Sequence, residues 1–178
     1  MKFRLFRPNP HDPIIAALYG TIVAQARSPA FYGRYGVPDT VQGRLEMIIL
    51  HTVLLLRRLE QDAESLRELG QAVFDHFCRD MDASLREMGV GDVTVPKKMR
   101  GIGEAFYGRQ AVYAAALATA DVGVLAGALE RNVLAGRRVG PARLATYVLE
   151  AAARLADQRD FERGELVFPD PESIQQPP

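Results

Sequence analysis

The stretch AESLRELGQAVFDHFCRDMDASLREM, residues 63–88, has the clearest periodicity in the sequence. Its apolar residues recur at spacings of three and four, which is the period of one face of an α-helix. They are Leu66, Leu69, Val73, Phe77, Met81, Leu85 and Met88. The acidic residues of the stretch fall mostly off this stripe. We therefore predict a long amphipathic helix over residues 63–88.

A second apolar stripe lies just before this helix and ends near Leu59. Its apolar residues also recur at helical spacing, beginning with Leu45 and Ile48. Asp39 or Thr40 is the expected N-cap, because a short polar side chain accepts hydrogen bonds from the first free N–H groups of a helix. These features predict a second long helix, from about residue 40 to about residue 59.

Two proline pairs mark helix starts near the N-terminus. Asp12-Pro13 and Ser28-Pro29 each place a capping residue before a proline at the first helical position, where the missing N–H costs nothing. We expect a helix from the first pair to about Ala26. The second pair begins a short helix through an aromatic cluster of Phe31, Tyr32 and Tyr35.

Glycine and proline also divide the second half of the chain. The segment Gly-Val-Gly at 89–91 ends the helix over 63–88, and Pro96 opens the next, which continues to about residue 117. Asp121 is the expected cap of a helix to about residue 134, and Gly140-Pro141 precedes a final helix over roughly 142–158. The segment 90–95 is the best strand candidate, and it is too short to pair alone.

Composition agrees with one folded domain. The chain has 178 residues, of which 48% are hydrophobic, so it can form a core. We predict an all-α fold, a single-domain bundle of about six to seven helices. We expect a basic N-terminal arm over 1–10, a helical domain over 11–160, and a loosely ordered tail, rich in proline, glutamine and acids, over 161–178.

The sequence does not predict export or a membrane span. The start of the chain lacks the apolar region and cleavage site of a signal peptide. The most apolar run, residues 47–56, is far shorter than the roughly 20 residues needed to cross a bilayer. Cys78 is the only cysteine, which fits a reducing compartment. We expect a protein that is soluble or peripheral to a membrane, with no transmembrane segment.

Glycine-rich spacing near residue 101 invites comparison with a phosphate loop. Gly101, Gly103 and Gly108 match neither nucleotide-binding glycine pattern, and no strand–helix unit surrounds them. We interpret them as sites of close helix packing, where glycine lets another backbone approach.

The other candidate chemical groups lack partners at useful spacing. His11, His51 and His76 show no metal-ligand pattern, so we interpret them as surface or packing residues. Acidic neighbours of Cys78 predict an unreactive structural thiol. We expect no catalytic residue, no cofactor and no metal, although an enzyme with a site in the bundle core is a third hypothesis beside the two below.

The basic run Lys97, Lys98 and Arg100 is locally unfavourable. It follows Pro96 at a helix start, where the positive end of the helix dipole repels cations. A position that breaks a local rule is a pointer to function, although a solvated or acid-neutralised surface explains the run equally well. Nearby aromatic residues such as Tyr107 could stack bases, but we expect them in the core.

Two stretches together resemble a known family. The first is YGRYGVPDTVQGRLEMIILH, residues 32–51. The second is MDASLREMGVGDVTVPKKM, residues 81–99, leading into EAFYGR at 104–109. In this order they resemble the ubiquinol–cytochrome c chaperone family, and the similarity covers about residues 10–158. The chain resembles the bacterial branch of the family, because it begins almost at the shared domain.

The resemblance implies a non-enzymatic assembly chaperone for cytochrome b or the cytochrome bc1 complex, which acts by binding a client or partner protein. Mitochondrial members of the family work with a small partner protein, bind the ribosome and receive newly made cytochrome b. We therefore expect a cytoplasmic location, or a peripheral one at the cytoplasmic face of the inner membrane. The alternative is a ribosome- or RNA-binding module that uses the basic residues of 97–109 and 131–143.

The family has no established catalytic residues, so the resemblance supplies only candidate interaction residues. These are Tyr32, Tyr35, Asp39, Arg44, His51, Asp92, Pro96, Lys97, Lys98, Tyr107 and Arg109. Among them we interpret Lys97, Lys98 and Arg109 as a contact surface for a partner protein ahead of RNA.

Overall fold

The computed structural model describes residues 12–61, 63–119 and 121–174. This part of the chain forms helices and no strand, which confirms the all-α prediction. The α-helices are α1 (Asp12–Ala26), α2 (Pro29–Gly33), α3 (Val41–Leu59), α4 (Glu64–Glu87), α5 (Val95–Thr119), α6 (Val122–Asn132) and α7 (Pro141–Asp157). A 3-10 turn, η1 (Asp160–Arg163), follows α7. The expected basic arm over 1–10, and His11, lie outside the described residues.

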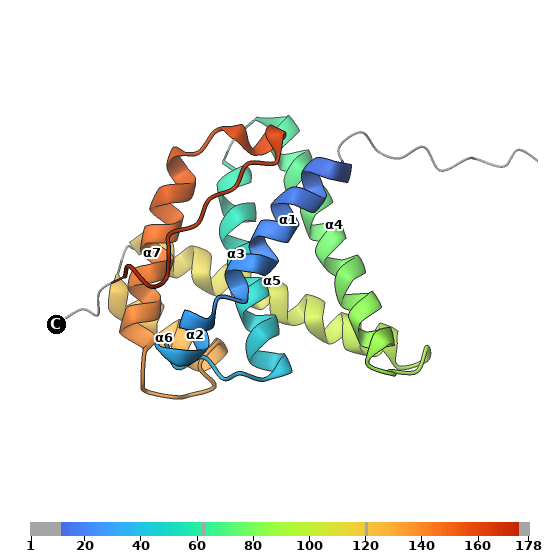
Figure 1. Cartoon of the computed structure of the whole chain (residues 1–178), viewed down its shortest axis with the longest axis horizontal. Helices are drawn as coiled ribbons and strands as arrows, with labels where there is room; N and C mark the ends of the chain where they lie inside the picture. The colour runs from blue at the N-terminus through green and yellow to red at the C-terminus, as the bar shows by residue number, and fades with distance from the viewer. Residues whose placement is uncertain (1–11, 62, 120, 175–178) are drawn as a thin grey trace, which may run out of the picture.

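Helix α3 is the centre of the bundle. It contacts α1, α4, α5 and α7, and Figure 1 shows it with α7 on one side and α4 on the other. Its segment MIILHTVLLL, residues 47–56, is apolar on every face, as expected for a helix that is surrounded by others. All ten residues of that segment are buried. The other helices therefore bury one stripe each against α3 or against a neighbour.

Local capping signals place the helix starts as the sequence predicts. Thr40 accepts a hydrogen bond from the Gly43 N–H at 3.1 Å, and Asp121 accepts one from Gly123 N–H at 2.7 Å. Ser28 precedes Pro29 at the start of α2, but its side chain makes no capping hydrogen bond. These signals are readable because a cap depends on residues within one turn of itself.

The predicted stripe of α4 faces the core along most of its length. Val73 and Phe77 are fully buried, whereas Met88 at its end is 56% exposed. Figure 1 shows the reason: the end of α4 and the start of α5 extend past the other helices as a two-helix tip. The last turn of the stripe therefore has no third helix to cover it.

The tail differs from the loosely ordered segment that the sequence led us to expect. Residues 161–174 pack against the bundle, with Leu166, Phe168 and Ile174 buried. The Tyr35 hydroxyl donates to the Pro171 carbonyl at 2.6 Å, and Arg143 donates to the Ile174 carbonyl at 2.8 Å. Figure 1 shows this segment, in red, running back beside α7. The buried apolar residues that hold this segment are widely spaced. A prediction from its proline-rich composition therefore overlooks them.

Candidate protein-binding groove

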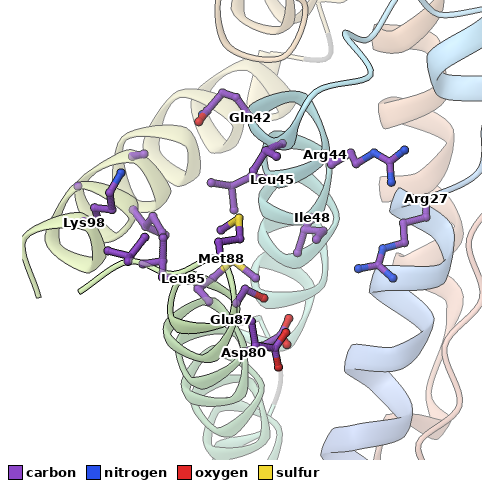
Figure 2. A pocket seen from close by; sticks show the side chains of 17 residues that line it. Arg27, Gln42, Arg44, Leu45, Ile48, Asp80, Leu85, Glu87, Met88 and Lys98 are labelled. Carbon is purple, nitrogen blue, oxygen red and sulfur yellow. The ribbon is translucent and has the colours of Figure 1, made fainter. Parts of the chain in front are cut away.

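An open groove of about 750 Å³ lies between α3, the second half of α4 and the first half of α5. Its centre is apolar. Figure 2 shows Leu45 and Ile48 from α3 facing Leu85 and Met88 from α4. Ile102 of α5 completes this apolar lining. The groove lies at the base of the two-helix tip, where the core ends.

Both sequence motifs contribute walls to this groove. The α3 wall comes from the stretch 32–51 and includes Val41, Leu45 and Ile48. The α4 wall, with Met81 and Met88, comes from the second stretch. The two motifs are separated in the sequence by the end of α3 and most of α4, and the fold brings them face to face.

The side of the groove formed by α5 includes residues with small side chains. Lys98, Gly101, Ile102 and Ala105 line the groove and share one helical face, because they follow the i, i+3, i+4, i+7 spacing. A Cβ added at Gly101 would meet nothing within 4 Å, and the same holds at Gly103 and Gly108. The predicted close packing at these glycines is therefore wrong, since open space adjoins each of them.

Charged side chains lie at the margins of the groove. Figure 2 shows Arg27 and Arg44 on the α1 side and Lys98 on the α5 side. The Arg44 guanidinium donates to Asp39 at 2.7 Å and lies 5.7 Å from the centre of the Tyr32 ring. Tyr32, Asp39 and Arg44 therefore form one surface cluster beside the groove, as their shared motif suggests.

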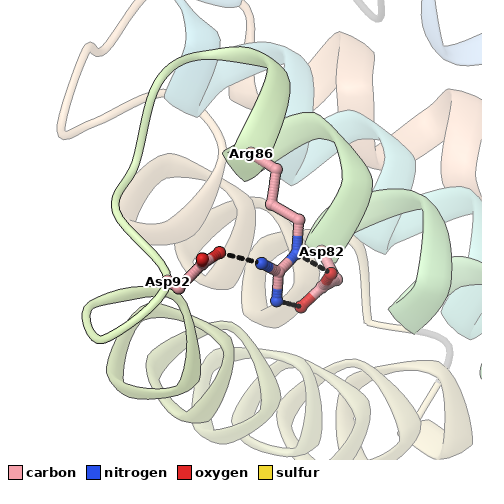
Figure 3. Close-up of polar contacts among 3 residues, drawn as sticks. All are labelled: Asp82, Arg86 and Asp92. Atoms are coloured by element: carbon pink, nitrogen blue, oxygen red, sulfur yellow. Dashed lines mark hydrogen bonds and ion pairs between the residues drawn. The ribbon is translucent and has the colours of Figure 1, made fainter.

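The loop of the tip is fixed to α4 by one arginine. Figure 3 shows Arg86 between Asp82, to which its Nε donates at 2.6 Å, and Asp92, to which its Nη1 donates. Asp92 is exposed, yet this ion pair gives it a structural role. The neighbouring Val93 is 95% exposed, so this loop presents an apolar side chain to solvent.

Arg109 holds the bundle together beside the groove. It donates to both carboxylate oxygens of Glu46, at 2.8 and 3.1 Å, and Glu46 is only 2% exposed. Gln42 donates to the same carboxylate at 2.9 Å. The hydrogen bond with Glu46 raises the pKa of Arg109. Arg109 is paired with α3 and a quarter of its side chain is exposed, so its role as a contact residue stays a prediction.

His51 and Tyr35 are also core residues, contrary to their selection as interaction residues. Both are fully buried. His51 Nδ1 donates to the Met47 carbonyl at 2.7 Å, and its Nε2 accepts from the Tyr147 hydroxyl at 2.8 Å. Gln25 donates to that hydroxyl at 2.9 Å, which completes a buried polar network. A helical-wheel position gives no sign of such a network, because its members come from three elements.

The remaining candidates are on the surface. Pro96 and Lys97 are exposed beside the groove lining, while Lys98 is part of it. Tyr107 was expected in the core, but it is 60% exposed and lies with its ring centre 5.8 Å from that of Phe74. It borders a separate, smaller cavity of about 230 Å³.

Several groove residues were missed by the sequence reasoning. Leu45, Met81 and Met88 were assigned only to helix stripes, although they line the groove. Nothing in their spacing separates a side chain that meets the core from one that meets an open groove. The available signal is indirect: the α4 stripe continues to Met88, one turn further than the core needs.

The described residues offer little reactive chemistry. They contain no group of three or more His, Cys, Asp or Glu residues placed to hold a metal ion. Burial, and then the charge of Asp75, raises the pKa of the Cys78 thiol, which makes the thiolate scarcer.

Among the residues that the structure describes, no helix is both long and apolar enough to cross a membrane.

The fold and groove define a small all-α protein with an open apolar groove that has charged side chains at its margins. The model of the ubiquinol-cytochrome C chaperone family matches residues 33–168. The chain belongs to that family, which confirms the resemblance seen in the two motifs.

Two relatives support this assignment. The chain is 28% identical over 122 residues to ubiquinol-cytochrome-c reductase complex assembly factor 1 of Xenopus laevis. That match covers 67% of this chain and 60% of the relative, so the chain spans less than two thirds of the relative's length. The fold is similar to the crystal structure of the Cbp3 homolog from Brucella abortus, with a TM-score of 0.85, 37% identity and 93% of each chain covered.

Proposed function

We propose that this chain is a non-enzymatic assembly chaperone for the cytochrome bc1 complex, ubiquinol–cytochrome c reductase, and that it acts by binding a protein. Cytochrome b, or another subunit of that complex, is the proposed client, and a small partner protein is proposed to assist. Family membership supports the choice of complex. The relative named as an assembly factor supports the same choice.

One observation carries the proposal: the two family motifs face each other across an exposed apolar groove. Val41, at 68%, and Met88, at 56%, are both largely exposed at its edge. Contiguous exposed apolar surface with a charged margin is typical of a site that binds another polypeptide. The family signature thus falls where a client or partner could dock.

A deletion strain tests this function. We expect loss of the gene to lower the amount of assembled bc1 complex and of haem-loaded cytochrome b, measured by native gels and by haem b absorbance. Normal levels of both would overturn the proposal. The same strain carrying the gene on a plasmid is the control, and it is expected to restore both signals.

The proposed location is cytoplasmic, with peripheral contact at the cytoplasmic face of the inner membrane. The exposed Val93 at the tip and the following Lys97 and Lys98 support such contact, because apolar and basic residues together favour an anionic bilayer surface. Cell fractionation checks it: a peripheral protein leaves the membrane fraction in high salt, and recovery only in the soluble fraction at low salt would exclude it.

The ribosome- or RNA-binding alternative rests on fewer residues than the sequence suggested. Lys97, Lys98 and Arg100 are exposed and form no salt bridge within the described part of the chain. Arg109 and Arg143, however, are engaged by Glu46 and by the tail. The loop between α6 and α7, which carries Arg137 and Arg138, lies across the molecule from the start of α5 (Figure 1). The two basic stretches therefore do not form one surface.

Co-sedimentation with ribosomes separates this alternative from the main proposal. Binding through phosphate contacts should fall steeply as salt rises, because each neutralised phosphate releases a counterion. Substitution of Lys97 and Lys98 by glutamate should then abolish it. Absent or salt-insensitive co-sedimentation would exclude the alternative.

A further inference from the structure

We refer to this open groove as the trough. Most of its lining comes from α3, α4 and α5, and Arg27 of α1 stands at its margin. Figure 2 shows its labelled polar side chains around the edge, with Gln42 at one end and Glu87 and Asp80 toward the other, and they do not converge on a single point. A small metabolite needs several convergent polar groups to fix its orientation. An apolar trough instead suits one face of a helix about 10 Å across.

The lining side chains are of an adaptable kind. Met81 and Met88 flank Leu85 along one side of the trough. Methionine is unbranched and polarisable, and it is common on surfaces that accept varied apolar partners. No aromatic side chain belongs to the described lining, so the trough offers no platform for stacked bases.

The α5 side of the trough leaves room for the backbone of a bound helix. Gly101 and Ala105 carry minimal side chains on the face that lines the trough. The space beside Gly101 is open, as the position of a built Cβ shows. Small residues on one helix allow a second helix to approach closely, so the wall can receive a helix without a large rearrangement.

Two basic side chains lie on opposite sides of the trough. They are Arg27 and Lys98, and neither forms a salt bridge within the described residues. The lining also holds two carboxylates, Asp80 and Glu87, and both come from α4. Asp80 accepts a hydrogen bond from the Tyr19 hydroxyl at 2.7 Å. A ligand with acidic groups on both flanks would therefore be complementary to the margins.

We propose that the trough binds one amphipathic α-helix of a partner protein, with an apolar seam and acidic residues on both flanks of that seam. The seam lies against Leu45, Leu85 and Met88, while the flanking carboxylates meet Arg27 and Lys98. The inference deepens the proposed function, because it rests on the groove being the protein-binding site and adds the chemistry of the bound segment.

Synthetic peptides test the proposal directly on the full chain. The probe is a fluorescein-labelled peptide of about 18 residues, or five helical turns, with leucines at i, i+3, i+4 and i+7 spacing and glutamates beside them. One control replaces each glutamate by lysine, and another shuffles the order so that the leucines share no face. Fluorescence anisotropy should show the glutamate peptide binding at least about tenfold more tightly than either control, which is about 1.4 kcal/mol.

Paired variants locate the binding. Gly101→Leu fills the trough, whereas Gly103→Leu adds the same side chain to an open position on the same helix outside the lining. We expect the first to weaken the glutamate peptide at least about tenfold and the second to leave it unchanged. Lys98→Glu and Lys97→Glu form the second pair. Lys98→Glu alone should weaken the glutamate peptide and strengthen the lysine peptide.

Several results would overturn the proposal. Equal binding of the three peptides, or equal effects within each variant pair, would do so. Binding of phosphatidylserine vesicles but not of peptide would assign the trough to a membrane. A dimer in light scattering that Gly101→Leu disrupts would assign it to a second copy of the chain. If the deletion strain loses bc1 complex while no peptide binds, the proposed function stands and this inference fails.

Discussion

At the scale of single residues, His51 is held neutral by its burial in the core. Its Nδ1 donates to the Met47 carbonyl and its Nε2 accepts from the Tyr147 hydroxyl, so both ring nitrogens are occupied. A protonated ring has two donors, and its Nε2 could no longer accept that hydrogen bond. Burial lowers the pKa of His51 to about 4. The sequence alone gives no sign of this arrangement, because only the assembled bundle brings Tyr147 to His51.

This histidine makes stability depend on pH. Its pKa is about 6.5 when unfolded and about 4 when folded, so the unfolded chain binds the extra proton between these values. The stabilisation is complete above about pH 6.5 and is lost as pH falls toward about 4, by roughly 3 kcal/mol in total. Urea unfolding at several pH values should show a loss of about 2 kcal/mol between pH 7 and pH 5 that is absent in His51→Gln. Parallel profiles would contradict this assignment.

The buried carboxylate of Glu46 makes Arg109 important for folding. Removal of Arg109 leaves a buried charge without its strongest partner, which typically costs 3–5 kcal/mol. Because a quarter of the Arg109 side chain is exposed, we expect Arg109→Ala to lower the free energy of unfolding by about 2 kcal/mol. Urea denaturation measures this, and the loss should shrink in a Glu46→Gln background. Arg44→Ala, which breaks an exposed pair, should change stability little.

At the scale of elements, the sequence predicts features that depend on residues close by in the chain. Helix boundaries followed from caps such as Thr40 and Asp121, and the α4 stripe from its period. It was harder to predict which face of a helix is buried and which is exposed to solvent. Tyr107 is exposed and the α5 glycines adjoin open space, because α5 continues past α3 and only part of it has a partner. Composition alone also misjudged the tail.

The tail is therefore expected to contribute to stability. Phe168 is buried and packs edge-on against His51, with ring centres 5.0 Å apart. Its truncation to alanine should lower the free energy of unfolding by about 3 kcal/mol, as for other core phenylalanines. Val167 is 55% exposed and is the matched control, since Val167→Ala removes apolar atoms from the same segment outside the core. Equal effects in thermal or urea unfolding would mean that the tail is loosely held in solution.

At the scale of the whole molecule, the groove depends on how three helices meet. The sequence supplied both motifs and, through the resemblance, the family. It could not show that Leu45 and Met88 would face each other, because their contact depends on the packing of α3 against α4. Some motif residues, such as Tyr35 and Arg109, build the fold that holds the walls. Others, such as Lys98, line the groove itself.

The difference between residues that build the fold and residues that line the groove predicts which substitutions affect function without affecting folding. Gly101→Leu and Gly103→Leu both add a helix-favouring side chain to open space on α5, so both proteins should fold at least as well as the parent. Only Gly101 lines the groove. In the deletion strain, Gly103→Leu should restore bc1 complex to the parental level, whereas Gly101→Leu should restore little of it, as measured by haem b absorbance at matched protein abundance. Full rescue by Gly101→Leu would place the functional surface elsewhere. Failure of both variants despite normal folding would instead indicate that the whole exposed face of α5 is used, because the two glycines share only that helix.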